Sequence, residues 1–338
     1  MRLVRPITFA DLQALEQLAV VAGGSMSTLP ANRDHLSEMI ARTQQSLRAD
    51  VDQPGEQSYH FVLEETDTGE ILGVSGIDAA VGLDTPFYSY RIEQLVHASS
   101  DLQIHNRIPA LHLCQDYTGA SRLCSLFLAP EHRNSDNLNL LSRARMLFMA
   151  CHRQRFADKT LVELQGIVDG ANKSPFWEAI GRHFFSMDFS RANYLTGIQS
   201  KSFIADLMPH YPVYIPLLPD EAQQVIAAPR PDIVPVVELL EAEGFRHRGY
   251  VDIFDAGPTL ELATDQIKTL EQSRPQAFES LAASDADLPA ALLCNQQLAG
   301  FRCVMTTAPV PRDELETRIV APLQLSPGDE LRLQLLAP

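Results

Sequence analysis

The stretch that most constrains the fold is LCSLFLAPEHRNSDNLNLLSRARMLFMA, residues 123–150. It begins as an apolar strand, continues as a polar, Asn-rich loop, and ends as a helix that carries Arg143 and Arg145. A helix N-terminus offers unpaired backbone N–H groups and a positive dipole end to the preceding loop. With Arg133 at its start, the loop predicts a site for a polyanion such as a cofactor pyrophosphate. An ordinary strand–helix connection with solvated arginines is the alternative.

Helix and hairpin signals surround this stretch. Asp11 precedes leucines at helical spacing, and Gly23 ends the periodic pattern, which predicts a helix between them. Residues 59–79 read as two apolar strands around the turn Asp67-Thr68-Gly69. Weaker patterns predict strands at 2–8, 87–97, 108–114, 160–169 and 249–262, and helices near 34–48, 174–185, 204–208 and 234–243.

The chain of 338 residues is long enough for two or three domains. From about residue 276 the pattern changes to short strands, including 323–336 around a Pro-Gly-Asp turn, which predicts a small β module. We therefore expect an α+β protein with units at 1–190, 191–275 and 276–338. The helix-then-strand pattern of the second unit loosely echoes the end of the first, so a degenerate second copy is one interpretation.

Charge and cysteine content exclude several classes of protein. The net charge of −16 argues against a nucleic-acid binder, which needs a basic face. The N-terminal segment is interrupted by Asp11 and Glu16, and no apolar run approaches the ~20 residues of a membrane span, so we expect a cytoplasmic protein without membrane contact. Five cysteines without a CxxC motif indicate reduced thiols, and no cysteine–histidine spacing matches a common zinc site, so no metal is expected.

The order of these elements resembles the GNAT acyltransferase fold, whose strand–helix loop cradles the pyrophosphate of an acyl-coenzyme A. The family loop has Arg or Gln, two residues, Gly, one residue, then Gly or Ala. Arg133 matches the first position, whereas Asp136 and Leu138 occupy the two small-residue positions. Asn137 and Asn139 tolerate left-handed backbone better than most residues, which partly replaces glycine. The resemblance implies that Arg133, Asn137, Asn139 and Arg143 bind the cofactor.

Longer blocks resemble the arginine N-succinyltransferase family, which includes arginine/ornithine succinyltransferase subunits. The resemblance covers roughly residues 1–275 and rests on SMSTLPAN, FVLEETDTG, FYSYRIEQLVHAS, LCSLFL, LLSRARMLFMA, SPFWEAIGRHFFSMDFSRANYLTG, IADLMPHYPVYIPLLP and GYVDIFDAGPTLE. It implies succinyl transfer from succinyl-CoA to the α-amino group of L-arginine, or of L-ornithine, as the first step of a catabolic route. It also implies a homo-oligomer or a paralogous partner subunit. The alternative is a catalytically weak structural or regulatory subunit of a hetero-oligomeric enzyme.

The resemblance also places individual residues. Leu126 matches the family position that contacts succinyl-CoA, where the strand backbone would pair with the pantetheine amides. Arg230 stands where the family has its proposed proton-donor histidine. Because a guanidinium has no accessible neutral form, Arg230 cannot shuttle protons, and it is instead a candidate carboxylate ligand or a solvated loop residue. His183 and Tyr194 are the candidates for proton transfer, with His97 as a further base.

A guanidinium substrate requires carboxylates. Glu93, Asp252 and Asp255 are the candidates, and ordinary surface charge is the alternative for each. Glu93 is also a candidate base. In a continuous strand, positions 252 and 255 face opposite sides, so both can serve one site only if a turn intervenes.

Overall fold

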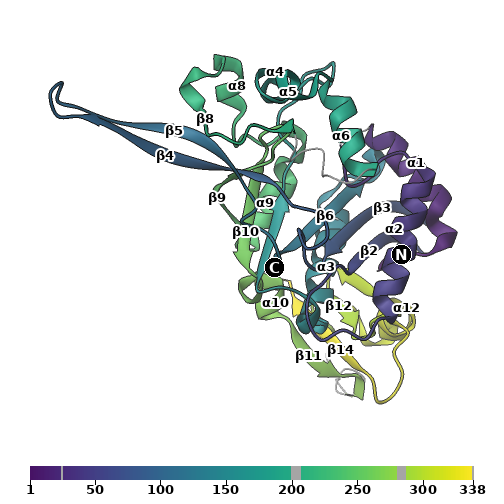
Figure 1. Ribbon diagram of the computed structural model, residues 1–338. Coiled ribbons are helices and arrows are strands. Elements are labelled where there is room, and N and C mark those ends of the chain that lie inside the picture. Colours follow the sequence, from purple (N-terminus) through teal and green to yellow (C-terminus); the bar gives the residue numbers. More distant parts are fainter. Residues whose placement is uncertain (24–25, 199–206, 280–286, 337–338) are drawn as a thin grey trace.

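The computed structural model describes residues 1–23, 26–198, 207–279 and 287–336. In these residues one sheet runs through the whole molecule, with helices on both faces of its central part (Figure 1). Its strand order is β11-β14-β12-β13-β1-β2-β3-β6-β7-β10-β9-β4-β5-β8. The structure is thus a mixed α/β fold built on a large mixed sheet. None of the described helices is long and apolar enough to cross a membrane.

The centre of the sheet is formed by β1 (Arg2–Pro6), β2 (Ser58–Glu65), β3 (Glu70–Asp78) and β6 (Ser121–Leu128). Within this group, each strand pairs antiparallel with the next. The turn between β2 and β3 includes Gly69 at φ +73°, a left-handed conformation that glycine adopts readily. The hairpin predicted at 59–79 is therefore confirmed.

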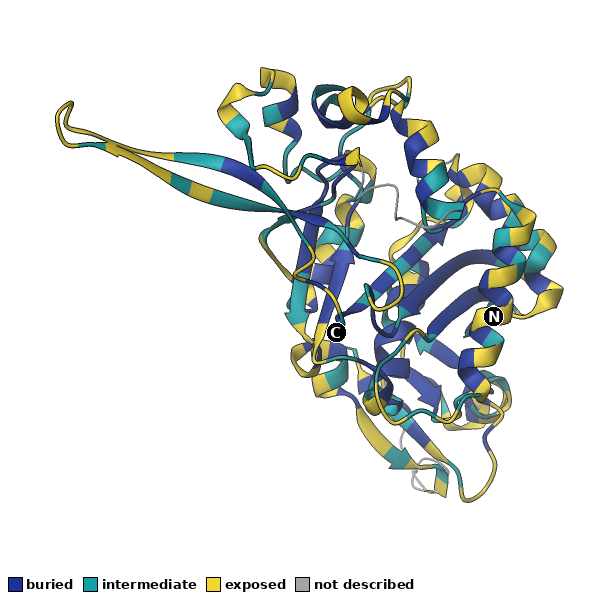
Figure 2. Cartoon of the chain, viewed as in Figure 1, coloured by how far each residue is buried: buried dark blue, intermediate teal, exposed yellow. Residues whose placement is uncertain are grey.

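Alternation along the central strands supplies apolar side chains to both faces. Val62 and Val74 face the layer of α1 (Leu12–Ala22) and α2 (Arg33–Arg48). Phe61 faces the opposite layer, where α3 (Ser135–Cys151) packs through Phe148 at a ring-centroid distance of 5.0 Å. The dark interior strands of Figure 2 mark this two-sided core. The predicted helices at the N-terminus and near 34–48 are confirmed.

One pair of central strands is parallel and short. β7 (Lys159–Glu163) pairs with β6 only at Ser121↔Thr160 and Arg122↔Leu161. Beyond these two positions the strands diverge, and the sheet continues through β10 (Pro258–Ala263) and β9 (Arg246–Val251). The strand expected at 160–169 is thus shorter than predicted, and its end borders a gap in the sheet.

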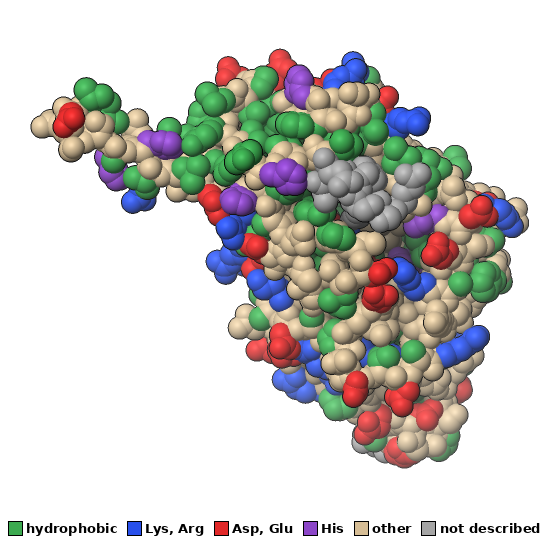
Figure 3. All heavy atoms as spheres, in the orientation of Figure 1, with side chains coloured by type: hydrophobic (Ala, Val, Ile, Leu, Met, Phe, Trp, Pro, Cys, Tyr) green, Lys and Arg blue, Asp and Glu red, His purple; other side chains and the backbone are tan. Residues whose placement is uncertain are grey.

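A long hairpin projects from the body of the molecule (Figure 1). It consists of β4 (Ser89–Ser99) and β5 (Ile104–Cys114), which confirms the predicted strands and extends them. Near the base, β5 also pairs with β8 (Val213–Tyr214). The outer half is exposed, with Leu102 at 71% exposure near the tip (Figure 2), and its side chains are mostly uncharged (Figure 3).

Several local predictions were wrong. The strand expected at 249–262 is two strands, β9 and β10, because a turn with Ala256 at φ +56° interrupts it. The helix at 174–185 breaks at Ile180 into α4 (Pro175–Ala179) and α5 (Gly181–Phe185). It is followed by α6 (Phe189–Ile198), so the helix-then-strand echo of a second copy is not seen there. The expected helix at 204–208 lies mostly outside the described residues.

The C-terminal strands extend the same sheet. They are β11 (Arg274–Ala277), β12 (Ala291–Asn295), β13 (Cys303–Thr306) and β14 (Glu330–Leu335). β13 joins the centre through one pair, Val4↔Cys303 on β1. The division into three units stays a prediction. The remaining described α-helices are α8 (Asp220–Val225), α9 (Val234–Ala242), α10 (Lys268–Gln272) and α12 (Ala321–Leu323). Helix α9 matches the helix expected near 234–243. Helix α12 ends at the residue where the final hairpin was predicted to begin.

Candidate active site

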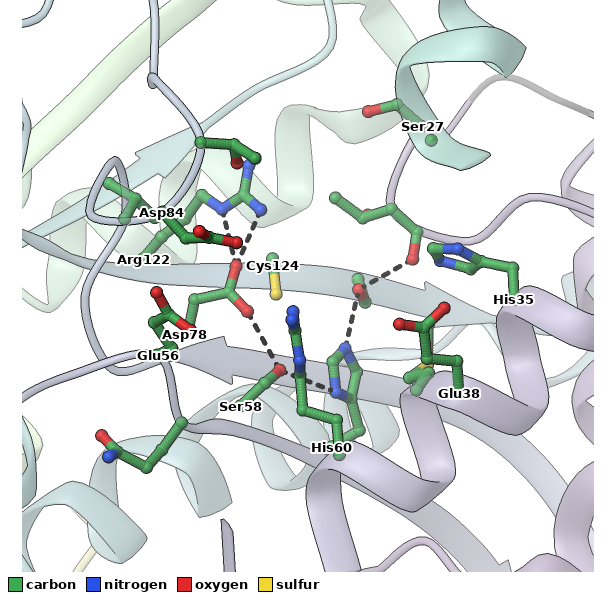
Figure 4. A pocket seen from close by; sticks show the side chains of 18 of the residues that line it. Ser27, His35, Glu38, Glu56, Ser58, His60, Asp78, Asp84, Arg122 and Cys124 are labelled. Atoms are coloured by element: carbon green, nitrogen blue, oxygen red, sulfur yellow. Dashed lines mark hydrogen bonds and ion pairs between the residues drawn. The ribbon is translucent and has the colours of Figure 1, made fainter. Parts of the chain in front are cut away.

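Two neighbouring cavities meet at strand β6. The larger, about 440 Å³, contains the carboxylates of Glu38, Glu56, Asp78 and Asp84, and we call it the acidic cavity (Figure 4). The smaller, about 140 Å³, lies where β6 and β7 diverge, and we call it the strand cleft. The two cavities share a wall that is formed by Ser27, Thr28, Arg122, Cys124 and Ser125. Two molecules bound in these cavities would therefore approach each other along this wall.

Ser125 stands at a bulge in this shared wall. The register of β3 with β6 changes from Val74↔Phe127 to Gly76↔Cys124, so β6 carries one extra residue there. Ser125 takes up this residue at φ +53°, a left-handed conformation that is uncommon for non-glycine residues. Its side chain is buried, and its hydroxyl donates to the Thr28 carbonyl at 3.2 Å. Such local strain is characteristic of functional sites.

A half-buried ion pair anchors the floor of the acidic cavity. Arg122 contacts Asp78 at 2.7 Å and Glu163 at 3.2 Å, and Ser58 donates to Asp78 at 3.0 Å. Burial disfavours the ionised form of Asp78, but the Arg122 charge and these hydrogen bonds outweigh it, so the pKa of Asp78 is lowered. Asp78 is therefore a fixed negative charge rather than a proton donor at neutral pH.

Two other groups of the shared region are held neutral. Burial lowers the pKa of His60 to about 4, so its imidazole is uncharged at neutral pH. Burial also raises the pKa of the Cys124 thiol to about 12. Because the thiolate is the nucleophilic form of cysteine, Cys124 is a poor candidate for a covalent intermediate.

The predicted pair Asp252 and Asp255 is brought together, because the intervening turn places both on the lining of the strand cleft. Both carboxylates are occupied by the backbone. Asp252 accepts from the Phe254 N–H at 2.7 Å, and Asp255 accepts from the N–H groups of Gly166 at 2.9 Å and Gly257 at 2.8 Å. Burial raises the pKa of Asp255. These contacts tie the turn to the end of β7.

The other predicted substrate ligands lie outside both cavities. Glu93 is on the projecting hairpin, where it accepts from Arg91 at 2.7 Å and lies 3.5 Å from His112. Arg230 directs its guanidinium to Asp232, with one contact at 2.9 Å. Its backbone N–H donates to the Gln165 carbonyl at 2.9 Å, which places the residue beside the strand cleft.

The predicted cofactor loop is shorter than expected. Helix α3 begins at Ser135, and the Asn134 side chain caps it by accepting from the Asn137 N–H at 2.9 Å. The Asn137 side chain donates to the His132 carbonyl at 2.8 Å, and that of Asn139 donates to the Ser135 carbonyl at 2.8 Å. These side chains stabilise the helix start, and their role in cofactor binding stays a prediction.

The remaining cofactor candidates are spread along β6 and α3. Leu126 lines the strand cleft. Arg133 donates to the Leu128 carbonyl at 3.1 Å and lies over the Phe127 ring, yet stays exposed at the end of the loop. Arg143 instead forms an ion pair with the buried carboxylate of Glu243 at 2.9 Å, on the core side of α3.

The proton-transfer candidates from the sequence lie at the surface. His183 is exposed on α5, and His97 is exposed on the projecting hairpin, 5.7 Å between centroids from the Tyr214 ring. Tyr194 is 37% exposed on α6, and its hydroxyl accepts from the Asn32 side chain at 3.3 Å. Their catalytic role stays a prediction. Sequence reasoning missed His60, Arg122 and Ser125, since no motif marks them.

Comparison with known proteins identifies the family. The family described as "Arginine N-succinyltransferase beta subunit" matches residues 2–269. The chain belongs to the arginine N-succinyltransferase family. It is an acyltransferase, as the sequence blocks predicted. The Arginine N-succinyltransferases of Salmonella typhimurium and Salmonella newport are 43% identical to it over 339 residues, covering 98% of this chain and 97% of theirs.

A solved structure of this family has the same fold. It is that of the arginine/ornithine succinyltransferase subunit AI from Pseudomonas aeruginosa, with a TM-score of 0.88 and 36% sequence identity. The match covers 100% of this chain and 99% of that one. The overall fold of this chain, including its large mixed sheet, is therefore that of a solved succinyltransferase structure.

Proposed function

We propose that this arginine N-succinyltransferase family member transfers succinyl from succinyl-CoA directly to the α-amino group of L-arginine, with L-ornithine as a second acceptor. The observation that carries the proposal is the meeting of two cavities at the bulge of β6. One cavity suits an extended acyl donor, and the other suits a cationic amino acid. The names of the relatives support the same pair of substrates.

The strand cleft is the proposed donor site. Because β6 pairs with β7 only as far as Arg122, its backbone beyond that point faces the cleft without a partner strand among the described residues. An extended pantetheine chain with two amides can pair there as an added strand, with Leu126 alongside. The pyrophosphate would then lie near Arg133 and the start of α3, where the helix dipole favours an anion. This arrangement supports the GNAT-like interpretation.

The acidic cavity is the proposed acceptor site. Glu38, Glu56 and Asp84 line it, and the Asp78 carboxylate is committed to Arg122. Free carboxylates pair well with a guanidinium or a side-chain ammonium. Arg42 lies on the same lining and can bind the acceptor's own carboxylate. This placement orients the α-amino group towards the shared wall.

The reaction itself needs no covalent enzyme intermediate. The neutral amine attacks the thioester carbonyl, a C–N bond forms, and the C–S bond breaks to release CoA. The α-ammonium group of the acceptor must first lose a proton, and because α-amino groups titrate not far above neutral pH, a modest base is sufficient. No metal enters this scheme.

A second candidate function is supported by Arg230. By the sequence resemblance it stands at the family's proposed proton-donor position, and its guanidinium is bound to Asp232. A chain without that donor could serve as a weakly active subunit beside a paralogous partner; the solved relative is itself named as a subunit, AI. We also propose that the chain works as a homo-oligomer or beside a paralogous subunit, and that it does so in the cytoplasm.

The test is CoA release by the purified chain alone. Succinyl-CoA is mixed with arginine or ornithine, thiol release is followed, and the succinylated product is identified by mass spectrometry. Glu38→Gln should raise the KM for arginine about tenfold or more, since a hydrogen bond to a charged group contributes about 1.5–3 kcal/mol. The exposed Glu131→Gln is the matched control. If thiol release with arginine or ornithine is no faster than release without an acceptor, the proposal of direct transfer is refuted and the weakly active subunit is favoured.

A further inference from the structure

A chain of hydrogen-bond contacts runs from the shared wall along the lining of the acidic cavity. Ser125 Oγ lies 3.3 Å from His60 Nε2, and His60 Nδ1 lies 3.3 Å from Ser58 Oγ. Ser58 Oγ lies 3.0 Å from the Asp78 carboxylate. Figure 4 shows this series as dashed lines from the cavity wall to the ion pair. The described chain thus places a hydroxyl, an imidazole, a second hydroxyl and a carboxylate in sequence.

The carboxylate determines the direction of the protons. Ionised Asp78 only accepts hydrogen bonds, so the Ser58 hydroxyl donates its single proton to it. Towards His60, Ser58 Oγ can then only accept, which favours the tautomer with the imidazole proton on Nδ1, where Thr43 Oγ1 at 3.5 Å is a second hydroxyl neighbour. His60 Nε2 is left with a lone pair directed at Ser125. The Ser125 hydroxyl can therefore donate to an unprotonated nitrogen, with Thr28 as its alternative acceptor.

Two features of the backbone arrange this contact. The bulge at φ +53° turns Ser125 out of the regular pleat of β6, at the wall that both cavities share. On the neighbouring strand, Gly76 leaves room for the imidazole, because a Cβ there would lie 2.6 Å from the His60 ring. Thr43 holds the backbone of His60 by accepting its N–H at 3.2 Å.

We propose that Ser125 and His60 form a proton relay for succinyl transfer, in which Ser125 Oγ is the group that touches the reacting amine. As the C–N bond forms, the amine proton moves to Ser125 Oγ and the serine proton moves to His60 Nε2. When the C–S bond breaks, the proton returns through Ser125 to the departing sulfur and yields the CoA thiol. One proton has moved from nitrogen to sulfur, and the enzyme is unchanged.

The surroundings of His60 suit transient rather than permanent protonation. The charged and titratable groups that act on it are Asp78, Arg122, Arg42 and His35. Burial outweighs the attraction of Asp78 and keeps the resting imidazole neutral, so Nε2 is available as an acceptor. The relay rests on the proposed function, because it needs an amine and a thioester at the shared wall. In the relay, His60 and Ser58 are positioning residues that act through Ser125.

The experiment compares two variants with a matched control. Ser125→Gly removes the hydroxyl and keeps the bulge, because glycine accepts φ +53° without strain. His60→Gln keeps a side chain that can hydrogen-bond to its neighbours but cannot take up a proton. The control is Ser75→Ala, which removes a buried hydroxyl of β3 that bonds to the Leu141 carbonyl instead.

We expect both relay variants to lose about 100-fold or more in kcat, with KM changed less than about threefold, since positioned acid–base groups contribute about 10²–10⁴. Ser75→Ala should keep kcat within about threefold. A purely structural role for His60 would be retained by glutamine. Thermal unfolding checks that each variant is folded, and Ser125→Ala replaces the glycine variant if that one fails.

The outcomes separate this inference from the proposed function. If the wild-type chain transfers succinyl and Ser125→Gly keeps more than a tenth of its kcat, the relay is refuted and the proposed function stands. The same holds if His60→Gln keeps more than a tenth. If the wild-type chain transfers no succinyl to either acceptor, the proposed function is refuted and the relay with it.

Discussion

Acid should destabilise this protein through His60. Its pKa is about 4 in the folded chain, against an ordinary value of 6.5, because the ring is buried. The unfolded chain therefore binds the proton first, and the stability contributed by the neutral ring is present above pH 6.5 and is lost as the pH falls towards 4. Between pH 7 and pH 5 this difference in proton binding lowers the free energy of unfolding by about 2 kcal/mol.

The assay is urea unfolding of the wild type and of His60→Gln at both pH values. The wild type should lose about 2 kcal/mol more than the variant between pH 7 and pH 5, whatever the variant costs at neutral pH. The exposed His97→Gln serves as a histidine-to-glutamine control that leaves the core untouched. His152 is also buried with a pKa of about 4 and adds the same loss to all three proteins. Equal losses in wild type and His60→Gln would refute the reasoning.

Three further predictions concern packing around the site. Arg122→Ala should lower the free energy of unfolding by about 1.5–3 kcal/mol, because it leaves the half-buried Asp78 carboxylate without its charged partner; exposed Arg182→Ala should cost less than about 1 kcal/mol in the same urea titration, and similar losses would contradict the burial argument. Gly76→Ala should lower kcat while binding of succinyl-CoA, measured by calorimetry, stays near wild type, since its Cβ displaces the imidazole ring; an unchanged kcat would show that the ring is not needed where it lies. Gly257→Ala should lower the free energy of unfolding by about 3 kcal/mol or more, because its Cβ would lie 2.0 Å from a backbone carbonyl. The loss should be seen as a lower melting temperature, and a variant as stable as wild type would mean that the turn can rearrange.

The local elements were largely predictable from sequence. The hairpin at 59–79 has apolar strands and a turn glycine. Helix α2 has a periodic apolar face, and Asn32 caps its N-terminus. In both elements the local signals agree with the final structure. The family was predictable because several separate blocks match it in order. These features depend on residues close together in the chain.

The site was not predictable in the same way. Its central features are the bulge at Ser125, the divergence of β6 from β7 and the burial of His60, and each depends on strands that are distant in sequence. No local pattern distinguishes a serine at a bulge from a serine in a regular strand. The turn at 252–257 was missed because its apolar flanks read as one continuous strand.

The position of β1 has a consequence for how the chain is made. This first strand is completed on one side by β2 as soon as about 65 residues have been synthesised, since Arg2 pairs with Glu65. Its other edge waits for Cys303 on β13, which is made much later. During that interval a strand from the middle of the final sheet remains an open edge, which is where misassembly between nascent chains begins. Arg2 and Arg5 on this strand pair with Glu65, Glu64 and Asp11 of the same early segment, so their charges are largely neutralised and the open edge stays exposed to mispairing until β13 is added.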